Sequence, residues 1–180
     1  MKKIIIVLLI ILTLFGCGLK NTPKDVVENY LDKYNTLDDN VLNDLQTSIA
    51  NENLSQTNAN TYKEILTRQY KDLKYEIKDE SIDGNNALVT VKITVYDLYK
   101  SQKDSELYMN ENINDFYDIN NMFDNELYMK HKLSQMLKQD KTIDYEITFY
   151  LENIEQEWVL KEPNRDVIEK IHGLYNYENN

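Results

Sequence analysis

The sequence predicts a single α+β domain, in which N-terminal helices pack on an antiparallel sheet, with a helical insertion between two hairpins and a short C-terminal helix. Two observations predict this fold. Apolar residues recur at helical spacing soon after the first twenty residues, and period-two alternation then appears in two separate regions, as in half-buried antiparallel strands. The 180 residues suit one domain, and a hydrophobic fraction of 42% is enough for a packed core.

The amino-terminal segment has the layout of an export signal. Lys2 and Lys3 provide a positive start, and residues 4–15 form a nearly unbroken apolar run. A membrane-spanning helix needs about 20 apolar residues, whereas the apolar region of a secretory signal needs about 7–15. The run therefore favours an export signal, and a retained membrane span is the alternative.

The residues that follow, Leu14-Phe15-Gly16-Cys17, resemble a bacterial lipobox, in which a small residue precedes the cysteine that receives a lipid. The resemblance implies cleavage between Gly16 and Cys17 and a covalent diacylglycerol group on Cys17, which is the only cysteine in the sequence. Because two acyl chains anchor a protein lastingly, it also implies attachment to the extracytoplasmic face of the cell membrane. An ordinary signal peptide that ends beside a chance cysteine is the alternative.

This interpretation divides the chain into four parts. Residues 1–16 are the lipoprotein signal peptide, residues 17–22 a lipidated tether, residues 23–175 the α+β domain, and residues 176–180 a polar tail. No Pro-rich or Gly-rich linker and no internal repeat divides the domain further.

Three helices are predicted at the start of the domain. Thr22 is a capping residue, Pro23 suits the first helical position, and Asp25 lies in the first turn. A second, short helix is predicted from Asp38, and a third from about Asn60. The polar stretch that precedes this third helix, from residue 51 on, is predicted to be a loop.

The two hairpins are predicted from alternating segments joined by turns. Residues 73–77 alternate, the turn signal Asp83-Gly84-Asn85 follows, and residues 87–95 alternate again. The second hairpin pairs residues 143–151 with residues 157–161.

The segments around the second hairpin complete the prediction. Between the hairpins, residues 100–125 are expected to be irregular, and a helix is expected from about Asp124 to Lys138. The last helix, Arg165 to His172, is expected to end at Gly173.

The stretch Thr22 to Leu31 resembles the opening helix of nuclear-transport-factor-2-like domains, and Glu157-Trp158-Val159-Leu160 is similar to their final strand. The resemblance implies helices packed across a curved antiparallel sheet to form a cone. The chain departs from this pattern at Glu155-Gln156, where such domains often carry Gly, and in a longer insertion at residues 100–138. An unrelated α+β lipoprotein fold is the alternative.

The composition excludes several functions. The 31 Asp+Glu outnumber the 20 Lys+Arg, for a net charge of −11, which argues against general nucleic-acid binding. A single cysteine excludes an internal disulfide framework and a Cys-rich zinc site.

His131 is expected on a solvated helix face. His172, in the last turn of its helix, is expected to interact as a cation with the helix dipole.

Catalytic signatures are not found in the sequence, so we predict no catalytic residue, no metal ligand and no cofactor beyond the lipid. The acidic residues between 104 and 126 raise the question of calcium. Asp118-Ile119-Asn120-Asn121 begins such a pattern, but the Gly and the spacing of a calcium loop are lacking, and a solvated charged face is favoured. An enzyme that uses carboxylates in the cone cavity is the alternative to a non-enzyme.

Aromatic residues concentrate in and near the insertion, and Phe116, Tyr117, Phe123 and Tyr128 form a candidate recognition surface. The alternative is that they are core residues. Together these features predict a lipid-anchored binding or interaction module on the outer face of a bacterial membrane. Its partner would be an envelope protein or a small apolar ligand. An accessory subunit of a transporter or of a wall-synthesis complex is a further alternative.

Overall fold

The computed structural model describes residues 21–179. The predicted signal peptide, Gly16 and the lipidation site Cys17 lie outside the described residues. Within residues 21–179, no helix is both long enough and apolar enough to cross a membrane.

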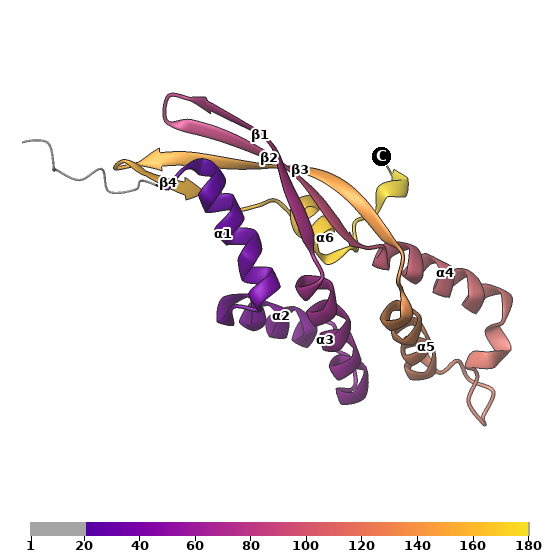
Figure 1. The fold of residues 1–180 in the computed structure, drawn as a ribbon. Coiled ribbons are helices and arrows are strands. Elements are labelled where there is room, and N and C mark those ends of the chain that lie inside the picture. Colours follow the sequence, from indigo (N-terminus) through magenta and orange to yellow (C-terminus); the bar gives the residue numbers. More distant parts are fainter. Residues whose placement is uncertain (1–20, 180) are drawn as a thin grey trace, which may run out of the picture.

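The fold is α+β, with helices around an open antiparallel sheet whose strand order is β1-β2-β3-β4 (Figure 1). The first half of the chain contains α1 (Pro23–Thr36), α2 (Asp39–Asn51), α3 (Gln56–Lys71), β1 (Lys74–Asp83) and β2 (Asn86–Tyr96). The second half contains α4 (Leu98–Glu111), the 3-10 helix η2 (Ile113–Phe116), α5 (Asn125–Lys138), β3 (Thr142–Ile154), β4 (Glu157–Leu160), α6 (Arg165–His172) and the 3-10 helix η3 (Tyr177–Asn179).

The predicted start of the first helix and the predicted end of the last helix are confirmed. Thr22 and Asp25 form a reciprocal capping box in front of α1. At the other end of the chain, Gly173 ends α6 with a φ of +71°. A Cβ at Gly173 would lie 2.2 Å from the carbonyl oxygen of Tyr96, so this position requires glycine for both its conformation and the close approach of the backbone.

Two predicted segments are wrong. The loop expected over residues 51–60 contains the first turns of α3, which begins at Gln56 behind the cap Ser55. The first turns of this helix are polar, so no apolar repeat marks them in the sequence. One of these polar residues, Asn58, is nevertheless buried, because its side-chain amide donates to Glu126 of α5. Of the stretch expected to be irregular, residues 100–125, the part up to Glu111 is instead helix α4, whereas residues 117–124 form a loop.

Helix α4 escaped prediction because much of what it buries is small and polar. Ser101 and Ser105 are both buried on it, and the Ser105 hydroxyl donates to the Ser101 carbonyl. Its charged residues form the pairs Lys100–Asp104 and Lys103–Glu106 on the helix surface. An apolar repeat of 3.6 residues is therefore weak in the sequence of this helix.

One face of the sheet carries the core, and the opposite face is largely exposed. On β2 the buried side chains alternate strictly, and they are Ala87, Val89, Val91, Ile93 and Val95. On β3, Tyr145 lies on the buried face and Tyr150 on the exposed face, where its side chain is 57% exposed. The alternation predicted for both hairpins is confirmed. Helices α1 and α6 pack against the sheet, and α3 packs against those two helices.

A buried amide connects three elements that are far apart in the sequence. Gln69 of α3 is 1% exposed; its Oε1 accepts from the backbone N–H of Tyr96, and its Nε2 donates to the carbonyl of Ile171, both at 3.0 Å. Tyr96 ends β2 and Ile171 lies in the last turn of α6. Gly173 then accepts from the backbone N–H of Tyr99 at the start of α4. One side chain thus sets the junction between sheet, core helix and insertion.

We expect Gln69→Met to lower the free energy of unfolding by about 3 kcal/mol, because it keeps the side-chain volume but leaves one buried N–H and one buried carbonyl without partners. Urea unfolding measures this difference. Gln46→Met, on the exposed surface of α2, is the matched control and should change stability by less than about 0.5 kcal/mol. Equal effects of the two substitutions would show that the buried amide is not a structural junction.

Candidate functional site: the helical arm

The insertion between the two hairpins forms a helical arm, which we define as α4, η2, the loop of residues 117–124, and α5. Figure 1 shows the arm leaving the ends of β2 and β3 and reaching beyond the sheet. Its two long helices pack against each other, and α5 also packs against α3. The arm therefore has a base at the sheet, a side held by α3 and an outer tip.

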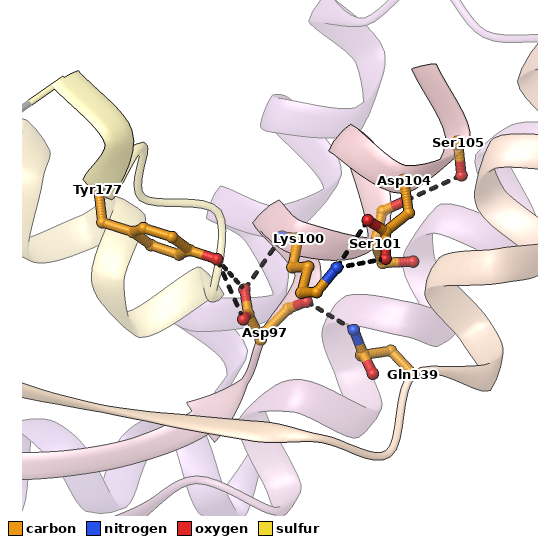
Figure 2. A network of polar contacts seen from close by, with 7 residues as sticks. All are labelled: Asp97, Lys100, Ser101, Asp104, Ser105, Gln139 and Tyr177. Carbon is orange, nitrogen blue, oxygen red and sulfur yellow. Dashed lines mark hydrogen bonds and ion pairs between the residues drawn. The ribbon is translucent and has the colours of Figure 1, made fainter. Parts of the chain in front are cut away.

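Asp97 organises the base of the arm, as Figure 2 shows. Its side chain caps α4 by accepting from the N–H of Lys100 at 3.0 Å, and it also accepts from the hydroxyl of Tyr177. Its carbonyl accepts from Nε2 of Gln139, and its N–H donates to the carbonyl of Lys141. Asp97 therefore connects the first residues of the arm, the residues that follow the arm, and the C-terminal segment.

The predicted polar tail of residues 176–180 includes Tyr177, which takes part in this base. Its ring packs edge-on against Tyr99 of α4, with ring centroids 4.9 Å apart. Desolvation, followed by the nearby Asp97 carboxylate, raises the pKa of Tyr177 to about 12, so its hydroxyl keeps the proton that it donates to Asp97. The C-terminal residues thus support the arm.

Helix α5 is fastened to α3 at both ends. Near its start, Glu126 accepts hydrogen bonds from the side chains of Ser55 and Asn58. At its end, the guanidinium of Arg68 donates to the carbonyls of Leu137 and Gln139, which the helix itself leaves unpaired. The same guanidinium lies 4.3 Å from the ring centroid of Tyr96. These contacts hold the arm in one orientation relative to the body.

An aromatic cluster fills the inside of the outer arm. Phe116 is 3% exposed and is surrounded by rings at centroid distances between 5.5 and 6.5 Å, contributed by Tyr108, Phe123, Tyr128 and His131. The ring of His131 also stacks on that of Tyr108 at 4.8 Å, with an interplanar angle of 15°. His131 is therefore half-buried in ring contacts, and the solvated position expected for it is wrong.

The loop at the end of the arm is held by its own backbone. The Asp118 carboxylate accepts from the N–H groups of Met122 and Asn120 at 2.9 and 2.8 Å, and the bond from Met122, followed by that from Asn120, lowers the pKa of Asp118. Tyr117 pairs with Phe123 as an antiparallel bridge, and the N–H of Asp124 donates to the carbonyl of Phe116. The Asp118 carboxylate thus stabilises a tight turn.

A metal site is not indicated in the part of the chain that the structure describes. Residues 21–179 contain no group of three or more His, Asp or Glu side chains placed to hold an ion. The Asp118 carboxylate that raised the question of calcium has its oxygens directed to the backbone and side chain of its own loop.

Exposed apolar side chains gather on the outer arm, and we call this set the arm tip. They come from both helices and from the loop between them. They are Leu107, Ile113, Ile119, Met122, Phe123 and Leu127. Ile119 is fully exposed, and Met122 is 61% exposed. Concentrations of exposed apolar surface on a soluble protein commonly mark interaction sites.

The structure divides the predicted recognition surface. Phe116 is buried as the centre of the aromatic cluster, Tyr117 and Tyr128 are half-buried, and Phe123 is 42% exposed. The sequence interpretation missed Ile119 and Met122, because it weighed aromatic residues alone. An apolar residue inside the polar run Asp118–Asn121 was the signal that could have identified Ile119.

A polar groove of about 540 Å³ lies between α4 and α5 on the same arm. Ser101 and Ser105 line it from α4, and His131, Gln135 and Lys138 line it from α5. The groove exists because serines leave space where larger side chains would fill the contact between the two helices. Its lining contrasts with the apolar arm tip.

Comparison with known proteins finds no matching family model and no matching curated protein. Among solved structures, the chain is similar to ycdA, a proposed lipoprotein from Bacillus subtilis subsp. subtilis str. 168, with a TM-score of 0.43 and 12% sequence identity. The match covers 76% of this chain and 46% of that chain, so it spans less than half the length of the other protein. A likeness of this degree assigns neither family nor activity.

We expect Phe116→Ala to destabilise the outer arm by about 3–5 kcal/mol, because it removes the ring around which the aromatic cluster packs. Native-state amide exchange of residues 108–128, together with urea unfolding, measures the effect. Ile119→Ala is the matched control on the exposed side and should stay within about 0.5 kcal/mol of the parent. Similar exchange rates in the two variants would contradict the assignment of Phe116 as the support of the tip.

Proposed function

We propose that this protein is a lipid-anchored binding module, held on the outer face of a bacterial membrane through Cys17, which binds an envelope protein through the arm tip. The observation that carries the proposal is the arm tip itself: exposed apolar side chains mounted on a packed aromatic cluster. The anchor rests on the lipobox residues Leu14 to Cys17.

The construction of the arm supports a binding role. A surface held in one conformation before binding loses less conformational entropy when a partner docks. The contacts of Arg68 and Glu126 hold α5 against α3, and Asp97 holds the base, so the tip is organised in advance. Exposing apolar side chains to water has no benefit for the stability of the isolated domain, so their place at the end of a fixed arm favours a partner.

The positions of the tip and the tether favour a protein partner over the bilayer. Figure 1 shows the start of α1 and the arm tip at opposite ends of the molecule. The tether of residues 17–22 is short, so the end of the domain beside α1 stays close to the membrane. Without Lys2 and Lys3 of the predicted signal peptide, 18 basic and 31 acidic residues are left, and this net charge of −13 opposes close contact with an anionic bilayer surface. The arm tip would therefore extend away from the lipid.

The cone fold, the apolar ligand and the carboxylate enzyme stay predictions. The helix-covered face of the sheet is filled by core side chains such as Val91, Ile93 and Phe149. This filled core favours the binding module as the first function to test.

We expect position 119 to crosslink to a partner in living cells. The photoreactive residue p-benzoylphenylalanine replaces Ile119 in the full lipoprotein, and irradiation should give a discrete protein adduct, because this side chain is fully exposed at the tip. The readout is the mass of the adduct by gel and mass spectrometry. Met122→Asp in the same chain should abolish the adduct without lowering the amount of lipoprotein, since a charge would be desolvated at the contact.

The control places the same photoreactive residue at Ile82, an apolar residue that is 55% exposed near the turn of the first hairpin. It should give no discrete adduct. Equal adducts at the two positions would contradict a specific interface at the arm tip. An adduct made only with lipid at position 119 would contradict the protein partner.

We expect the protein isolated from its host membrane to begin at Cys17 and to carry a diacylglycerol group on that sulfur. Intact-mass analysis measures both features in one spectrum. Cys17→Ser is the control, because it lacks the thiol to which the lipid is attached. An unmodified Cys17, or a chain that still carries residues 1–16, would overturn the proposed anchor.

A further inference from the structure

A second candidate site lies away from the arm, in a cleft of about 370 Å³. Helices α1, α2, α3 and α6 and the segment before α6 all contribute to its lining. Its polar lining includes Tyr30, Tyr34, Asp44, Tyr70 and His172. The volume lies within the range of about 300–1,000 Å³ that is usual for small-molecule sites.

Three tyrosines contribute to the lining of this cleft, of which Tyr30 is half-buried and Tyr34 and Tyr70 are buried. The rings of Tyr30 and Tyr34 pack edge-on with centroids 5.6 Å apart, and Tyr34 packs edge-on against Tyr70 at 5.1 Å. The hydroxyl oxygens of Tyr30 and Tyr34 are 3.2 Å apart. Aromatic rings offer a negative face, and hydroxyl oxygens offer lone pairs, so both kinds of group attract a cation.

The formal charge of the lining is negative. Asp44 and Glu162 both line the cleft, and none of the described residues that line it is Lys or Arg. The Asp44 carboxylate is close enough to all three tyrosines to raise their pKa values, in addition to the larger effect of desolvation. A bound anion would therefore meet repulsion, and a bound cation attraction.

His172 adds no positive charge at neutral pH. Burial lowers its pKa to about 4, so the neutral ring pairs through Nε2 with the hydroxyl of Tyr70 at 2.9 Å. The cationic interaction with the helix dipole expected for His172 is therefore wrong, because the desolvation cost exceeds what a helix terminus supplies. The aromatic wall of the cleft is thus continued by an uncharged ring.

Apart from Ser48, the rest of the lining is apolar. Val41 and Leu45 come from α2, Pro163 precedes α6, and Ile168 comes from α6 itself. These side chains suit an alkyl group, whereas a bare metal ion would need several oxygen ligands in close array. The combination of aromatic rings, carboxylates and apolar side chains selects a ligand that has both a positive charge and hydrocarbon.

We propose that this cleft binds a small alkylammonium ion. The tyrosines and the carboxylates of Asp44 and Glu162 would attract the ammonium group, and the residues of α2 and α6 would contact its alkyl part. The site is independent of the arm tip, so its failure would leave the proposed protein-binding function in place, and the reverse also holds.

The test measures binding of choline and of n-butylammonium to the full lipidated chain in non-ionic detergent by isothermal titration calorimetry. The neutral carbon analogue 3,3-dimethylbutan-1-ol is compared with choline, and 1-butanol with n-butylammonium. We expect at least one cation to bind about tenfold more tightly than its neutral analogue, since a desolvated cation gains most from aromatic faces. Cations that bind no more tightly than their neutral analogues would overturn the proposal.

Asp44→Asn is the informative variant, because Asp44 is exposed on α2 and its replacement should leave the fold intact. We expect it to weaken binding of the cation about fivefold and to leave the neutral analogue unchanged. Asp39→Asn on the same helix makes the same change of charge outside the cleft lining, and should change binding less than twofold. Equal losses in the two variants would show that total charge, and not the cleft, attracts the cation.

Discussion

The structure depends on one buried polar junction. Gln69 reaches from α3 into the space between the end of β2 and the end of α6, and each of its polar atoms takes up a backbone group there. Because a buried donor or acceptor without a partner costs about 1–3 kcal/mol, these hydrogen bonds favour the arrangement in which the three elements meet at Gln69. Gly173 completes the junction, since its missing side chain lets α6 approach Tyr96.

The helical arm begins directly after Tyr96, so this junction sets where the arm leaves the sheet. Directly after β2, Asp97 caps α4 at the start of the arm. Gln139 and Lys141, which follow the arm, form hydrogen bonds with the same residue. The body is held by apolar burial on one face of the sheet. The arm adds Leu98, Leu133 and Met136 to the same core, and its hydrogen bonds to α3 and to the base fix its orientation. The exposed apolar side chains of the arm tip lie outside this core.

Helix α3 connects the two candidate sites, although they are built from different helices. Helix α3 supports the arm through Arg68 on one side and supplies Tyr70 to the cleft on the other. The first site is apolar, exposed and suited to a protein surface. The second is concave, aromatic and negative, and it is suited to a small cation. The residues of one do not contribute to the other, so each can be removed by mutation separately.

The sequence by itself determined the elements whose signals are local. A capping box at Thr22, a turn at Gly84 and strict alternation along β2 each act within a few residues, and the structure has all three. Tertiary structure alone decided the rest. Helix α4 and the first turns of α3 bury serines and an asparagine, whose partners lie elsewhere in the chain, so no local repeat marks them. The tyrosine cleft joins residues that are more than a hundred positions apart, such as Tyr70 and His172. Only the packing of α6 against α3 brings those groups together, because proximity between distant segments depends on the whole chain's burial and not on any pattern within one segment.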